Sequence, residues 1–222
     1  MNLILSVVNT NALPTLEGIC QSLDLPLNVT MIGHGTATSS MLDLLGIESN
    51  EKRVVLTVAN PEKTKELIKE ARRNLFIGVP GHGIIVAVPI KSIGGGKTVA
   101  FLNEGSQVAG YKPELNYSYE LIIAIANIGH TDDVMNAARA AGATGGTVLH
   151  GKGTGSKEAE KFLHVSIAQE KEVIVIVAKS QQKSEIMKQI ISKAGVSTPA
   201  GAIAFSLPTS EVAGFGMFDQ NA

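Results

Sequence analysis

The stretch ILSVVN at residues 4–9 has a close counterpart in IIAIAN at residues 122–127. At the same spacing along the chain, GHGT at residues 33–36 aligns with GKGT at residues 151–154. Further matches follow in the same order, after an adjustment of one residue, up to the prolines Pro89 and Pro208. Because ordered self-similarity of this kind indicates duplication, the sequence predicts two copies of one unit.

Each copy is expected to fold as strand, helix, strand, strand, helix, strand. Runs of β-branched residues predict the strands, while apolar residues at helical spacing and the cap-like Thr131-Asp132-Asp133 predict the helices. In the first copy the strands are expected at residues 4–8, 29–32, 54–59 and 83–88, and the helices at 13–23 and 62–73. In the second copy they are expected at residues 120–126, 147–149, 173–178 and 202–207, with helices from Thr131 to Gly142 and at 184–193.

This order of elements predicts an α+β fold of two tandem ferredoxin-like (βαββαβ) repeats. The repeats are expected at residues 1–102 and 119–222, and residues 103–118, with two glycines and a proline, are expected to connect them.

Composition argues against several classes of protein. The 222 residues are 44% hydrophobic, which is enough for a core, and their 19 basic and 20 acidic side chains give a net charge of −1. Balanced charge, 4% aromatic residues and no Trp argue against a nucleic-acid-binding surface. The apolar runs are too short to span a membrane. A single cysteine and no basic leader point to the cytoplasm.

Spacing of reactive side chains favours neither catalysis nor a metal site. The five histidines form no HExxH or HxxxH pattern, and no GxSxG surrounds a serine. Cys20 has no CxxC partner and lies on an apolar helix face. His34 and His82 both flank glycines and could pair if their loops met. We therefore expect no catalytic residue, no metal and no cofactor.

Glycine-rich turns are the best candidates for ligand binding, because backbone N–H groups there can approach an anion closely. Two of these turns follow strands, and their threonine hydroxyls and one lysine could add contacts to phosphate or carboxylate. Others lie just before the last strand of each copy or after residue 91. The candidate residues are Gly33, His34, Gly35, Thr36, Gly81, Gly83, Lys97, Lys152, Gly153, Thr154, Gly155 and Gly201. Plain tight turns remain the alternative.

The segment GHTDDVMNAARAAGATGGTVLHGKGTG at residues 129–155 resembles the PII signal-transduction family. The resemblance covers both copies, with the first more divergent. It implies subunits that form trimers, a long loop after the second strand that engages partners, and clefts for adenine nucleotides and 2-oxoglutarate. Thr147 and Gly155 match family positions that contact nucleotide, and Gly201 matches a glycine of the phosphate-holding loop.

Other family positions differ. The lysine of the phosphate-holding loop falls on Ala202, and two arginines near the C-terminus fall on Ala213 and Phe215, which implies a changed ligand. The leading hypothesis is a non-enzymatic, PII-like, homo-oligomeric regulator, most simply a trimer. It would bind a small anionic metabolite or nucleotide in glycine-lined clefts and signal to a target protein through its central loops. A role in regulating nitrogen or carbon metabolism is implied.

Two other classes of function remain open: a metal-handling protein of the CutA type, and an enzyme that uses the same clefts. The second copy is expected to bind ligand better than the first, which has Val29 and Ala37 at the positions of Thr147 and Gly155.

Overall fold

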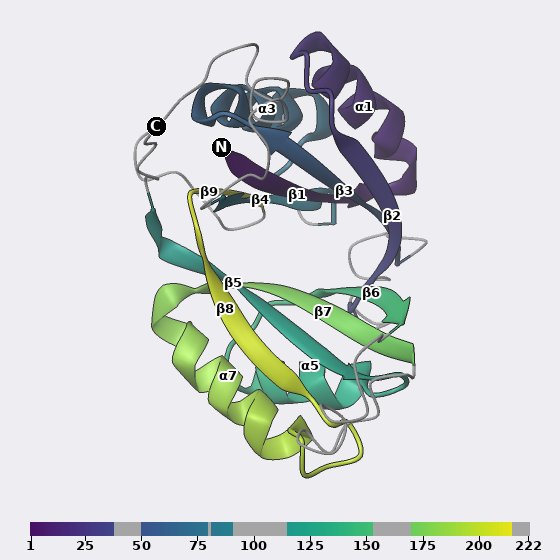
Figure 1. The fold of residues 1–222 in the computed structure, drawn as a ribbon, viewed down its shortest axis with the longest axis vertical. Helices are drawn as coiled ribbons and strands as arrows, with labels where there is room; N and C mark the ends of the chain where they lie inside the picture. Colours follow the sequence, from purple (N-terminus) through teal and green to yellow (C-terminus); the bar gives the residue numbers. More distant parts are fainter. Residues whose placement is uncertain (38–49, 80, 91–114, 153–169, 215–222) are drawn as a thin grey trace.

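A computed structural model describes residues 1–37, 50–79, 81–90, 115–152 and 170–214 (Figure 1). The first half of the chain contains β1 (Asn2–Asn9), the short 3-10 helix η1 (Thr10–Ala12), α1 (Leu13–Ser22), β2 (Asn28–Gly35), β3 (Glu51–Ala59), α3 (Pro61–Leu75) and β4 (Gly83–Pro89). The second half contains β5 (Asn116–Asn127), α5 (Thr131–Ala140), β6 (Thr147–Lys152), β7 (Glu170–Lys179), α7 (Ser180–Ala194), β8 (Ile203–Thr209) and β9 (Glu211–Gly214).

Each strand and helix expected from the sequence is present, with ends that differ by a few residues. Two additions are η1 and β9, neither of which was predicted. β5 begins at Asn116, so residues 116–118 of the expected connector belong to a strand.

All the strands form one nine-stranded sheet in the order β8-β5-β7-β6-β2-β3-β1-β4-β9. Every pairing is antiparallel. The first half contributes β4-β1-β3-β2 and the second β8-β5-β7-β6, so corresponding strands occupy corresponding places. The halves join where β2 pairs with β6, with Gly35 opposite Thr147. β9 then returns to the first half and pairs with β4.

The sheet curls so that its two halves face each other, with α1 and α3 outside one half and α5 and α7 outside the other (Figure 1). Three apolar clusters follow from this arrangement. One lies under α1 and α3, and another under α5 and α7. The third fills the space between the two halves of the sheet and includes Val86, Leu121, Val175, Val177 and Val212.

Local sequence explains the helix ends. Asn60 caps α3 by accepting a hydrogen bond from the Lys63 N–H at 2.8 Å, and Pro61 fits the first turn because its missing N–H is not needed there. Two acids in the first turn suit the N-terminus of α5, and Gly142, at φ 97°, terminates the turn that follows it. None of the helices in the described ranges has the length and apolar content needed to cross a bilayer.

Candidate functional site

Lys52 brings together two of the glycine turns predicted as a site in the first half. From the start of β3, its Nζ donates hydrogen bonds to Oδ1 of Asn9 and to the carbonyl oxygen of Gly81, the latter at 3.3 Å. Its stem passes Gly35, where an added Cβ would lie 3.5 Å from Lys52 Cε. Burial lowers the pKa of the Lys52 ammonium, and both described acceptors are uncharged. The end of β2 and the turn before β4 therefore share one partly buried cation.

The second half repeats this arrangement. Nζ of Lys171 lies 2.5 Å from Oδ1 of Asn127, and Lys171 is only 7% exposed. Asn127 also bonds to the turn before β8, because its backbone N–H reaches Ala200 O and its side-chain amide reaches Pro199 O, each at 2.9 Å. Both halves thus place a lysine and an asparagine beside the turn that precedes a later strand, β4 in the first half and β8 in the second.

These lysines were not among the predicted site residues. The signal was present in the sequence, because the Glu-Lys pair at 51–52 aligns with the pair at 170–171. A lysine at the start of a strand is usually exposed, however, so the sequence alone did not indicate burial. A buried ammonium beside open backbone turns can attract and hold an anionic group.

Two of the predicted glycines have structural explanations. A Cβ at Gly33 would lie 3.0 to 3.2 Å from side-chain carbons of Val54, Leu149 and Thr147, so Gly33 permits the close approach of β2 and β6. Gly83 has φ 142°, and a Cβ there would lie 2.3 Å from the carbonyl oxygen of Val7.

The remaining predicted residues are divided between the two halves. Thr147 is buried in β6, and the Gly201 N–H donates to Thr198 O at 3.0 Å. Lys152 ends β6. Four predicted residues lie outside the described ranges: Lys97, Gly153, Thr154 and Gly155.

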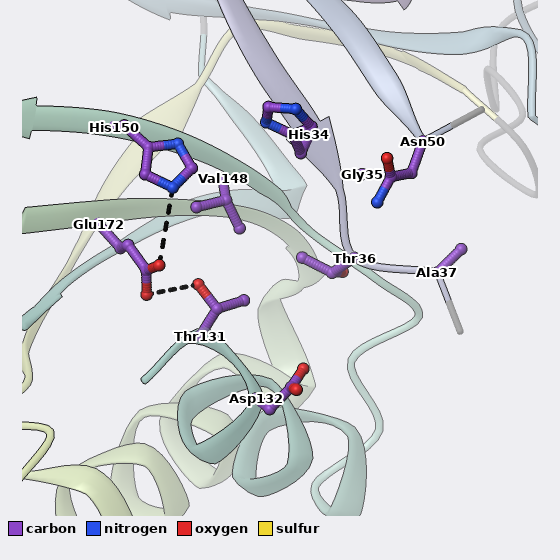
Figure 2. A pocket seen from close by; sticks show the side chains of 10 residues that line it. All are labelled: His34, Gly35, Thr36, Ala37, Asn50, Thr131, Asp132, Val148, His150 and Glu172. Atoms are coloured by element: carbon purple, nitrogen blue, oxygen red, sulfur yellow. Dashed lines mark hydrogen bonds and ion pairs between the residues drawn. The ribbon is translucent and has the colours of Figure 1, made fainter. Parts of the chain in front are cut away.

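A separate pocket lies where the two halves meet (Figure 2). It has a volume of about 230 Å³. The lining residues are His34, Gly35, Thr36, Ala37, Asn50, Thr131, Asp132, Val148, His150 and Glu172. It contains three of the predicted residues, together with acidic and imidazole groups from the second half that were not predicted.

Thr36, at one wall of this pocket, connects the two halves by hydrogen bonds. Its hydroxyl donates to Gly146 O at 3.0 Å and accepts from the Gly146 N–H at 2.9 Å. Its own N–H also donates to Gly146 O at 3.1 Å, and Arg139 donates to its carbonyl oxygen. The predicted threonine hydroxyl is therefore occupied in joining the halves.

The histidines that were considered as a possible pair do not come together. His34 lies edge-to-face with His150, with ring centroids 5.8 Å apart, whereas His82 contacts Leu75 O and the Phe76 ring. Within the described ranges, no group of three or more His, Cys, Asp or Glu side chains is placed to hold a metal ion.

Comparison with protein families matches residues 119–215 to the family described as Nitrogen regulatory protein P-II. The match runs from within β5 to the end of β9. No curated protein matches the chain. One similar solved structure is that of an unknown protein from Galdieria sulphuraria, whose sequence is 9% identical to this one. The alignment covers 93% of this chain and 97% of the Galdieria chain. Its TM-score is 0.29, too low to support an argument about fold or function.

Proposed function

The chain belongs, through residues 119–215, to the P-II nitrogen regulatory protein family, and we propose on this basis that it senses a small anionic metabolite or nucleotide. The family is one of regulatory signalling proteins, so the proposed output is a change in a target protein's activity. The central loops after β2 and β6 are the proposed points of contact with that target. We also propose a role in regulating nitrogen or carbon metabolism.

The observation that carries this proposal is the placement of two lysines, Lys52, which is partly buried, and Lys171, which is buried. Each lies beside backbone turns, and Lys52 donates only to neutral oxygens within the described ranges. Placing an ammonium group in a partly desolvated position is costly unless an anion compensates it. An anionic group bound against Lys52 and the glycine turns would supply that compensation.

We also propose that the chain is a duplication, with ferredoxin-like, PII-like repeats at residues 1–102 and 119–222 and a connector at 103–118. Two observations support it. The four strands of each half occur in the same order. The lysine–asparagine hydrogen bond, Lys52 to Asn9 and Lys171 to Asn127, also recurs in both halves.

Calorimetry with ATP, ADP and 2-oxoglutarate tests the anion site. Lys52→Met and Lys171→Met keep side-chain length but remove the charge, and each should weaken the anion that binds its half by about ten- to a hundredfold. Lys188→Met is the matched control, because the Lys188 side chain is 76% exposed on α7. Unchanged affinity in both buried-site variants, with thermal melting showing a folded protein, would place the anion elsewhere.

In the second copy Lys152, Gly153, Thr154 and Gly155 remain proposed site residues, together with Thr147 and Gly201. Lys152→Ala should weaken the same anions by about ten- to a hundredfold if the ammonium contacts them. His34→Ala provides the comparison in the first copy. Equal losses would mean that both copies bind, and no loss in either would exclude these loops.

We propose that the protein is not an enzyme, and turnover of the bound nucleotide would contradict this. Tight zinc or copper binding without nucleotide binding would favour the metal-handling alternative.

We further propose a homo-oligomer, most simply a trimer, because Val29 and Ile32 on β2 are 48% and 60% exposed. Light scattering of a dilute sample that reports a monomer would contradict this assembly.

A further inference from the structure

The pocket between the two halves contains a carboxylate with little compensation. Glu172 is 6% exposed, and its Oε2 accepts a hydrogen bond from the Thr131 hydroxyl at 2.7 Å. Its Oε1 lies 3.7 Å from Nε2 of His150, which is too long for a hydrogen bond (Figure 2). A buried carboxylate normally has a cation or several donors around it. Among the described residues, Glu172 has one hydroxyl donor, Thr131, and one imidazole beyond hydrogen-bond distance, His150.

The corresponding position in the first half shows the contrast. Arg53 aligns with Glu172 when the Glu-Lys pairs at 51–52 and 170–171 are superposed. Arg53 is neutralised within its own strand, because its Nη1 lies 2.7 Å from Oε1 of Glu51. Charge compensation is thus built into the first half at this position, while in the second half the carboxylate opens onto a pocket.

The other polar groups that line the pocket mostly accept hydrogen bonds. Asp132 adds a second carboxylate at the first turn of α5. Nδ1 of His34 is buried and has no hydrogen-bond partner among the described residues. His150 contributes a second imidazole, 52% exposed at the pocket mouth. Two carboxylates, with imidazole nitrogens beside them, favour a ligand that carries N–H donors.

We propose that this pocket binds a small organic cation through a primary ammonium group, with Glu172 as the counter-charge and the imidazoles of His34 and His150 as further acceptors. The volume of about 230 Å³ suits a ligand smaller than a nucleotide. An organic cation is favoured over a metal ion because the described residues offer no group of three or more His, Cys, Asp or Glu ligands. Although Gly35 borders both regions, the counter-charge proposed here is Glu172 and the pocket lining does not include Lys52 or Lys171, so each proposal can fail alone.

Calorimetry with putrescine, a four-carbon diamine, tests the proposal, with succinate as a dicarboxylate of the same carbon number. Wild-type protein should bind putrescine and not succinate in this pocket. Glu172→Gln keeps the shape of the side chain and should weaken putrescine by about ten- to a hundredfold, since a charge-assisted contact is lost. Glu185→Gln, on the exposed face of α7, makes the same change in net charge and should leave the affinity unaltered.

A second variant keeps the test decisive. If Glu172→Gln does not fold, Asp132→Asn replaces it, because Asp132 is exposed and lines the same pocket. No putrescine binding by the wild type, equal affinity in the carboxylate variants, or zinc binding abolished by Glu172→Gln would overturn the proposal.

Discussion

Gly83 is a residue whose lack of a side chain has a measurable consequence. Its φ of 142° is rarely adopted by other residues, and a Cβ would lie 2.3 Å from Val7 O. Gly83→Ala should therefore lower the free energy of unfolding by about 2 kcal/mol or more. Gly18→Ala in α1 is the matched control, because an added Cβ there would have no other atom within 4 Å. This substitution should raise the free energy of unfolding by about 0.5 to 1 kcal/mol. Urea denaturation of both variants measures the two effects, and a loss at both positions would contradict this explanation.

Lys52 should make stability depend on pH. Burial lowers its pKa in the folded protein, while the unfolded chain keeps the ordinary value of about 10.4. Between these two values the unfolded state binds more protons, so this group's contribution to stability rises with pH across that window. The urea midpoint of the wild type, relative to Lys52→Met, should therefore increase from about pH 7 to about pH 10. A decrease would mean that the ammonium is stabilised by an anionic partner.

At the scale of elements, the pairing of β2 with β6 depends on Thr36. Replacing its hydroxyl by a methyl group in Thr36→Val keeps the shape but leaves the Gly146 backbone without its side-chain partner. The expected cost is about 1 to 3 kcal/mol in the free energy of unfolding. Thr10→Val is the control, since the Thr10 hydroxyl makes an exposed hydrogen bond to Glu51 at 3.2 Å and should contribute little. Similar midpoints for the two variants in urea would show that β6 pairing does not need this hydroxyl.

At the scale of the whole molecule, the apolar cluster between the two halves of the sheet should make them unfold together. Leu121 is 2% exposed in this cluster, and Leu121→Ala should cost about 2 to 5 kcal/mol. Ile191→Ala is the control, because Ile191 is 45% exposed on α7. Circular dichroism monitors unfolding of the whole chain. Because there is no Trp, intrinsic fluorescence comes from the tyrosines, of which Tyr117 and Tyr119 lie in β5 in the second half. The two transitions should coincide in wild type and variant, and separate transitions would show that the halves are independent.

Hydrophobic periodicity and the internal repeat were enough to predict the helices and eight of the strands, because these patterns depend on neighbouring residues. Pairing between β2 and β6 could not be predicted in this way. From the sequence, Gly33 and Thr36 were predicted to belong to a ligand-binding loop. Only the approach of Leu149 and Gly146 from the other half shows that they join the two halves of one sheet. β9 was missed because four residues after a strand carry little local signal.

The sequence by itself determined the order of elements and the family resemblance of residues 129–155, which the family match confirms over residues 119–215, while the duplication stays a prediction. Tertiary structure alone decided that Lys171 is buried and Lys52 partly buried beside the turns, and that Glu172 faces His150 across a pocket between the halves. The physical reason is that burial and charge compensation depend on residues far apart in the chain. Backbone propensities act between neighbours, whereas the environment of a charge is set by whatever strand packs against it.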